Sequence, residues 1–83
     1  MTGLLITVMQ DDSLRKALGN RIKELRKAKD WSQKDLGKLL GTSSAQLNKY
    51  ESAQNTPQLD RLILLAELLD TTVDHLLTGN TSS

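Results

Sequence analysis

The stretch from Gln33 to Glu51 constrains the fold more than any other part of this chain. Ser32 can cap a helix that begins at Gln33, and Asp35 stands three residues further on, where a capping box has its second acceptor. Gly41 can take the left-handed conformation that ends many helices. Between these signals lie apolar residues at the spacing of one helix face: Leu36, Leu39 and Leu40. The stretch therefore predicts a short helix that stops at Gly41.

A second short helix is predicted directly after the first. Ser43 can cap it, with Gln46 at its N3 position, and Leu47 and Tyr50 mark a buried stripe. Two short helices joined by a tight turn favour a helix-turn-helix, whose second helix enters a DNA groove. An ordinary helical hairpin of a small bundle is the alternative. A glycine inside a helix costs about 1 kcal/mol relative to alanine. Gly37 is explained best if another helix crosses closely there, because a larger side chain would hold the two helices apart.

The composition indicates one small domain with a core made mainly of leucine. Of 83 residues 37% are hydrophobic, with no Phe, one Trp and one Tyr. Cysteine is absent and His75 is the one histidine, so we expect no disulfide, no metal site and no cofactor. No apolar run approaches the roughly 18 residues of a membrane span, and Leu4 to Met9 lacks the basic segment of a secretory leader. We expect a cytoplasmic protein with no membrane partner.

The charge is distributed unevenly along the chain. Residues 13–49 carry ten basic and three acidic side chains, a net charge of +7, whereas residues 50–83 have a net charge of −4. A small domain of this kind suits binding to a polyanion through one side. A solvated helix surface explains the basic segment equally well.

We divide the chain into an N-terminal arm (1–12), a helical domain (13–79) and a tail (80–83). The apolar residues of the arm favour a segment that docks on the domain or pairs with a second copy over a loose tail. Asp12 or Ser13 can cap a long helix that runs to about Lys29, and Gly19-Asn20 could interrupt it. Its predicted inward stripe consists of Leu14, Leu18, Ile22 and Leu25.

A fourth helix is predicted after a polar loop, with Thr56 as its cap and Pro57 as its first residue. Its expected inner face is Leu59, Leu62, Leu65, Ala66 and Leu69. Leu64 and Leu68 point to the opposite side, which indicates burial against the arm or a second subunit. Thr72 caps a last helix, which Gly79 ends. We assign a dimer interface to apolar residues of these two helices: Leu64, Leu68, Leu76 and Leu77.

Residues 18–79 resemble the Cro/repressor-type helix-turn-helix family of transcription regulators. The resemblance rests on R-I-K-E-L-R, S-Q-x-x-L, G-T-S, K-Y-E, a proline after the loop and L-x-x-L-x-x-L-A-x-x-L. It implies an all-α, five-helix lambda-repressor-like domain that binds double-stranded DNA. Two departures stand out: Gly37 replaces a usual alanine, and Ala53 replaces a usual glycine.

The resemblance also implies roles for single residues. Base-reading positions fall on Ser44, Ala45, Asn48 and Lys49. Phosphate-binding positions fall on Gln33, Ser43, Asn55 and Thr56. To these the charge pattern adds Lys34, with Arg21, Lys23 and Lys38 as further cations for phosphates. Arg26 and Glu51 match a partly buried structural ion pair.

The function predicted from the sequence is a sequence-specific DNA-binding transcriptional regulator, a repressor, that reads a palindromic operator as a homodimer. An antitoxin or another protein-binding module on the same fold is the alternative. An enzyme is not expected, because no paired carboxylates, no thiol and no phosphate loop are present.

Overall fold

The computed structural model describes residues 12–79, and this part of the chain forms helices without any strand. The predicted arm, apart from Asp12, and the predicted tail lie outside the described residues. The helices of the described part are α2 (Asp12–Ala28), α3 (Gln33–Leu40), α4 (Ser44–Glu51), α5 (Leu59–Leu68) and α6 (Val73–Thr78). The predicted all-α class with five helices is therefore confirmed. No helix in residues 12–79 is long and apolar enough to cross a membrane.

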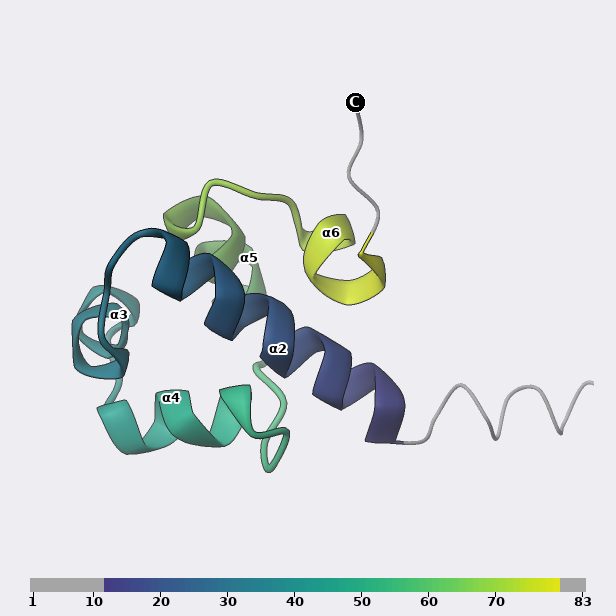
Figure 1. The fold of residues 1–83 in the computed structure, drawn as a ribbon, viewed down its shortest axis with the longest axis horizontal. Helices are drawn as coiled ribbons and strands as arrows, with labels where there is room; N and C mark the ends of the chain where they lie inside the picture. The colour runs from purple at the N-terminus through teal and green to yellow at the C-terminus, as the bar shows by residue number, and fades with distance from the viewer. Residues whose placement is uncertain (1–11, 80–83) are drawn as a thin grey trace, which may run out of the picture.

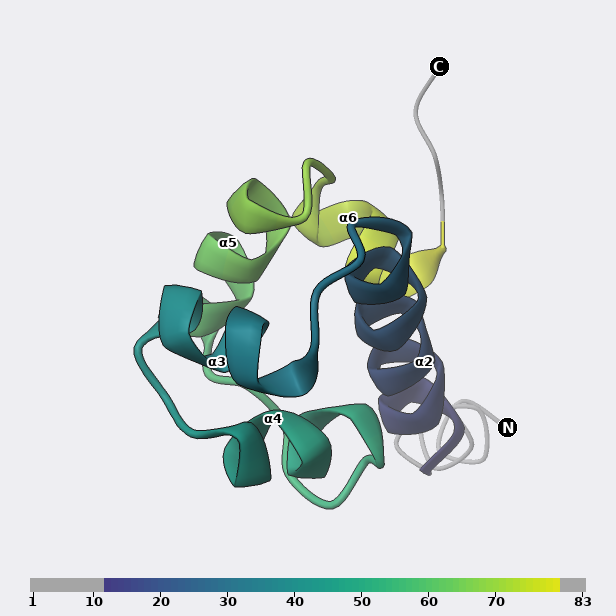
Figure 2. The ribbon, with the colours of Figure 1, turned by 60° about the vertical axis from the view of Figure 1, so that its left-hand side comes forward.

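The long helix α2 crosses the domain diagonally in the view of Figure 1 and packs on both α4 and α6. Helices α3 and α4 lie next to each other, and α5 and α6 cover the end of the domain away from α4 (Figure 2). The core between them is built largely of leucine, as predicted. Its members are Leu18, Ile22, Leu36, Leu40, Leu47, Tyr50, Leu62, Leu65, Ala66, Leu69 and Leu76.

The predicted start and end of α3 are confirmed. The Asp35 backbone N–H donates to Ser32 Oγ at 3.0 Å, and the Ser32 N–H donates to Asp35 Oδ2 at 2.9 Å. This pair is a complete capping box. Gly41 ends the helix at φ 80°, in the left-handed region. At α4, Ser43 Oγ accepts from the Gln46 N–H at 3.1 Å, as predicted.

Two glycines mark close backbone approaches, and only one of them was predicted. A Cβ at Gly37 would lie 3.1 Å from the carbonyl of Ser43. The neighbour at Gly37 is thus the turn that caps α4, and the predicted crossing helix is wrong. The tighter approach is at Gly19, where a Cβ would lie 2.5 Å from the Glu51 carbonyl oxygen. Helix α2 continues through Gly19-Asn20 without interruption, and the glycine there admits the end of α4.

The predicted beginnings of two helices are wrong. Asp12 and Ser13 both lie within α2, so neither precedes it. Helix α5 begins at Leu59 with Gln58 as its cap residue, two positions after the predicted start. Pro57 is buried in the loop before α5 instead of opening the helix.

The predicted helix faces also need correction. Leu14 and Leu59 are 42% and 69% exposed, so neither belongs to the core. Leu68 is partly buried against the core, so it does not point away from the domain. Ile63, which the predicted faces omit, is 46% exposed. The other residues of the predicted inner face of α5 are buried as expected: Leu62, Leu65, Ala66 and Leu69. Leu59 is exposed at the first residue of the helix.

Ala53 occupies a backbone conformation that suits glycine. Its φ is 67°, in the left-handed region, where a Cβ is unfavourable. We predict that Ala53→Gly raises the free energy of unfolding by about 0.5–1 kcal/mol, because relief of strain exceeds the added entropy of the unfolded chain. Ala17→Gly, inside α2, is the matched control and should lower it by about 1 kcal/mol. Urea denaturation of both variants measures the effect, and destabilisation by Ala53→Gly would contradict it.

The capping box makes stability depend on pH. Hydrogen bonds from the backbone and side chain of Ser32 lower the pKa of Asp35 from its ordinary value of 3.8, with help from Lys38 and Lys34. A lowered pKa in the folded state means that ionised Asp35 stabilises the fold above pH 3.8, and that this contribution is lost as pH falls through the folded pKa. We therefore predict that the difference in unfolding free energy between the wild type and Asp35→Asn shrinks in acid. Urea denaturation across the acid range measures it; a difference independent of pH would contradict the assignment.

Candidate nucleic-acid interface

Helix α4 has one buried face and one exposed face. Leu47, Tyr50 and Glu51 are buried, and this side of the helix packs on α2 and α3. The predicted base-reading residues share the opposite, exposed face: Ser44, Ala45, Asn48 and Lys49. The structure therefore presents these side chains together to solvent, on a helix held from behind.

The end of α4 is joined to α2 by a buried ion pair. Arg26 Nε donates to Glu51 Oε2 at 2.6 Å, and Arg26 Nη2 donates to Glu51 Oε1 at 3.0 Å. The side chains are 8% and 3% exposed. Arg26 Nη1 also donates to the Trp31 carbonyl at 2.7 Å. This two-pronged geometry is the strong form of an arginine–carboxylate contact, and it is the ion pair implied by the family resemblance.

Gln33 extends this network to α3. Its Nε2 donates to Glu51 Oε1 at 3.0 Å, so the predicted phosphate-binding amide is already engaged with the ion pair. An amide nitrogen carries two hydrogens, and the side chain is only partly buried. Lys34, the next residue, is exposed. The first turn of α3 is thus tied to α4 through Glu51.

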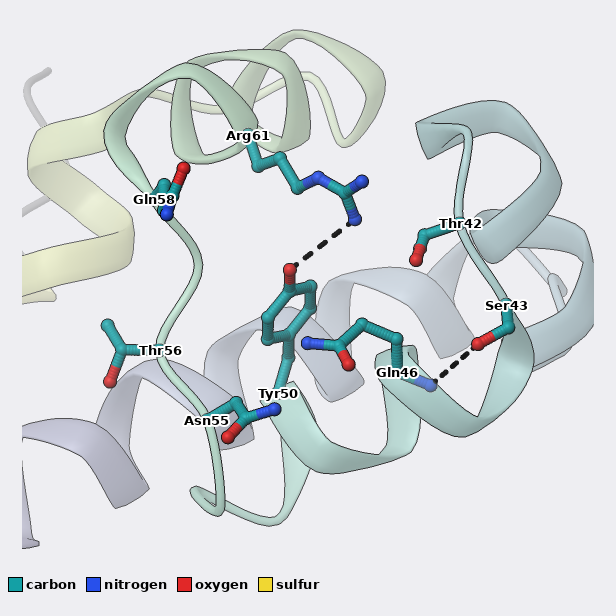
Figure 3. Close-up of a pocket in the computed structure, with 8 residues that line it drawn as sticks. All are labelled: Thr42, Ser43, Gln46, Tyr50, Asn55, Thr56, Gln58 and Arg61. Carbon is teal, nitrogen blue, oxygen red and sulfur yellow. Dashed lines mark hydrogen bonds between the residues drawn. The ribbon is translucent and has the colours of Figure 1, made fainter.

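A polar hollow of about 520 Å³ lies beside α4 (Figure 3). One wall comes from the α3–α4 turn and α4, and consists of Thr42, Ser43, Gln46 and Tyr50. The other wall comes from the loop before α5 and its first turn, and consists of Asn55, Thr56, Gln58 and Arg61. The hollow brings together three predicted phosphate-binding residues that are distant in sequence: Ser43, Asn55 and Thr56.

Arg61 and Tyr50 join this site, although the sequence analysis assigned no binding role to either. Arg61 Nη1 and Tyr50 Oη are 3.4 Å apart, with the guanidinium as donor. A signal for Arg61 was available, since it is the one arginine or lysine in residues 50–83. Arg21 is the reverse case: it was assigned to phosphates, but its Nη1 donates to the Leu76 carbonyl at 3.0 Å at the end of α6.

The residues assigned to a dimer interface fall into three groups. Leu64 and Leu77 are each 36% exposed. Leu68 is partly buried against the core. Leu76 is fully buried in its own domain, so it cannot contact a second copy, and its assignment is wrong.

The buried ion pair yields a stability prediction. Glu51→Ala should lower the free energy of unfolding by about 3–5 kcal/mol, because Arg26 would remain buried without a counter-charge. The double variant Arg26→Met/Glu51→Leu removes both charges and should be more stable than Glu51→Ala alone. Urea denaturation of the single and double variants tests this. A double variant less stable than Glu51→Ala would contradict it.

Comparisons with known proteins agree with this geometry. The chain is 45% identical over 58 residues to the HTH-type transcriptional regulator AnsR of Bacillus subtilis, covering 70% of this chain and 50% of the relative. It is 32% identical over 65 residues to repressor protein C2 of Salmonella phage P22, covering 78% of this chain and 30% of the relative. The chain thus spans about half the length of AnsR.

Solved structures show the same fold. The P22 c2 repressor in complex with a synthetic operator superposes with a TM-score of 0.73 at 32% identity, over 76% of this chain and 96% of that chain. The hypothetical transcription factor NHTF from Neisseria gives a TM-score of 0.73 at 25% identity, over 81% and 78%. The sequence pattern of the helix-turn-helix family matches residues 22–76. The chain belongs to the helix-turn-helix family, as its motifs predicted.

Proposed function

We propose that this chain is a sequence-specific DNA-binding transcriptional regulator that represses by occupying a palindromic operator as a homodimer. The observation that carries the proposal is the exposed face of α4. Ser44, Ala45, Asn48 and Lys49 project from a helix whose other side is fastened by core packing and the Arg26–Glu51 pair. The similarity to a repressor solved on its operator supports this use of the face.

The side chains of this face suit direct base recognition in the major groove. The Lys49 ammonium can donate to guanine O6 or N7, and the Asn48 amide can pair with adenine. The Ser44 hydroxyl can donate or accept and so discriminates less between bases. The Ala45 methyl can contact the methyl group of thymine. Specificity in this arrangement depends chiefly on Lys49 and Asn48.

Contacts to the phosphates supply the rest of the affinity. Lys34, Ser43, Asn55 and Thr56 are exposed around α4. Gln33 braces Glu51 with one amide hydrogen and can donate the other to a phosphate. Such contacts position the protein on the duplex without reading its sequence.

Selection of binding sites from random duplexes tests the proposal. We predict a palindromic consensus with half-sites about one helical turn apart. Lys49→Ala should cost about 1–3 kcal/mol at one base pair in each half-site and relax the preference there. Lys34→Ala is the matched control: it removes the same charge but should weaken all sequences alike. Recovery of no preferred sequence, or an equal effect of both variants on all sequences, would contradict base reading by α4.

The homodimer is the second part of the proposal. Leu64 and Leu77 expose apolar surface on the two C-terminal helices, and a second copy can cover it. We predict that Leu64→Asp shifts the chain toward monomer in analytical ultracentrifugation and weakens operator binding. Leu39→Asp, an equally polar change at an exposed leucine of α3, is the control and should leave the dimer intact. A Leu64→Asp chain as dimeric as the wild type would rule out α5 as the interface.

A further inference from the structure

The hollow beside α4 has the chemistry of a site for an anion. All of its lining side chains are polar, and none of the lining residues is a carboxylate (Figure 3). Arg61 is the one cation among them. Asp60 is adjacent in sequence, but its Oδ1 accepts from the backbone N–H of Arg61 at 2.9 Å, and Asp60 does not line the hollow. A cation in a polar hollow without a carboxylate leaves a positive charge for a ligand to neutralise.

The Arg61 guanidinium has donors to spare. Its contact with Tyr50 Oη, at 3.4 Å, is longer than the usual N–H···O range of about 2.7–3.2 Å. Within residues 12–79 no salt bridge pairs Arg61 with an acid. Tyr50 is 6% exposed and rigidly placed in the core, so its hydroxyl can orient the guanidinium toward the hollow without satisfying it. The Arg61 guanidinium thus presents several N–H groups in the direction set by its contact with Tyr50 Oη.

The hollow begins where the exposed face of α4 ends. Gln46 lies one helical turn from both Lys49 and Tyr50, so it separates the base-reading face from the hollow. A helix with its side chains is about 10–12 Å across, and the major groove is about 12 Å wide. A helix that fills the groove therefore brings its flanks to the phosphates that border it. The hollow lies on the Gln46 side of α4, where one of these phosphates would be.

We propose that one phosphate of the duplex backbone enters this hollow in each half-site and is bound by the Arg61 guanidinium, which Tyr50 orients. Ser43 and Asn55, on opposite walls, lie on either side of the same phosphate. The inference rests on the proposed function and adds to it a specific clamp that joins α4 to α5. Free phosphate has the same chemistry, so the test must separate the two sources.

Three variants measured on the selected duplex test the clamp. Arg61→Met should weaken binding to all sequences by about tenfold, because a charged hydrogen-bonded contact is lost, and should make the log–log salt slope shallower by about 1 per subunit. Arg61→Lys keeps the charge and should retain the slope with a smaller loss. Tyr50→Phe should retain the slope and lose a few-fold in affinity. Thermal melting of each free variant checks that the fold is intact.

Duplexes that carry a single neutral methylphosphonate, placed at each backbone position in turn, show which phosphates contribute to affinity. A purely structural role of Arg61 would not change which positions are sensitive. With the wild type, one neutralised position in each half-site should reproduce the loss caused by Arg61→Met. With Arg61→Met, that position should become less sensitive, while the position contacted by Lys34 remains sensitive. Arg61→Lys keeps the charge and should remain sensitive at the Arg61 position. Unchanged sensitivity at every position in Arg61→Met would overturn the proposal, even if this variant is less stable.

Inorganic phosphate alone is the remaining arm. Binding of inorganic phosphate that perturbs the Arg61 side-chain resonances, combined with unchanged duplex affinity of Arg61→Met, would identify a small-anion site and overturn the clamp. Duplex affinity that is the same in Arg61→Met as in the wild type defeats only this inference. A wild-type chain that binds no duplex defeats the proposed function as well.

Discussion

The buried pair between Arg26 and Glu51 is the interaction on which the rest of the structure depends. Helix α4 has eight residues, too few to be stable in isolation. Leu47 and Tyr50 hold its inner side in the core, but apolar packing alone tolerates small rotations. The two-pronged contact to Glu51 fixes the end of the helix in position and direction. Gln33 and the Trp31 carbonyl satisfy further hydrogen-bonding groups of the pair, so the buried charges are well compensated.

The same arrangement explains the two glycines inside helices. Gly19 admits the backbone carbonyl of Glu51 against α2, and Gly37 admits the turn at Ser43. A Cβ at Gly19 would lie 2.5 Å from the Glu51 carbonyl oxygen and would clash with α4, and a Cβ at Gly37 would press on the turn that begins it. One side of α4 is fixed in this way. The residues on its exposed side can therefore suit a ligand without changing the core.

Local features of this fold could be predicted from the sequence, and features set by packing could not. The capping box of Ser32 and Asp35, the end at Gly41 and the cap at Ser43 each depend on a few neighbouring residues, and all are present. The start of α5 was misplaced because Pro57 is used for packing, which a start signal does not reveal. The burial of Leu76 and the exposure of Leu59 depend on which neighbours each residue meets in the folded domain. In a leucine-rich chain, the spacing of apolar residues does not show which of them have such neighbours.

The candidate site shows the same division. The outward direction of Ser44, Ala45, Asn48 and Lys49 follows from helical spacing once Leu47 and Tyr50 are placed inward. The engagement of Gln33 with Glu51, and of Arg21 with the end of α6, required the tertiary structure. So did Arg61, which reaches Tyr50 from a different helix.

Mapping of backbone amide chemical shifts, as the ¹⁵N-labelled chain is titrated with its selected duplex, tests the central claim most directly. The account predicts that the largest changes occur along the exposed face of α4, at Ser44, Ala45, Asn48 and Lys49, and extend to the loop at Asn55 and Thr56. The amides of Ile22 and Leu65 in the core should change little. Changes concentrated on α5 and α6, with α4 unaffected, would contradict the claim that this chain reads DNA through the helix that Arg26 and Glu51 hold in place.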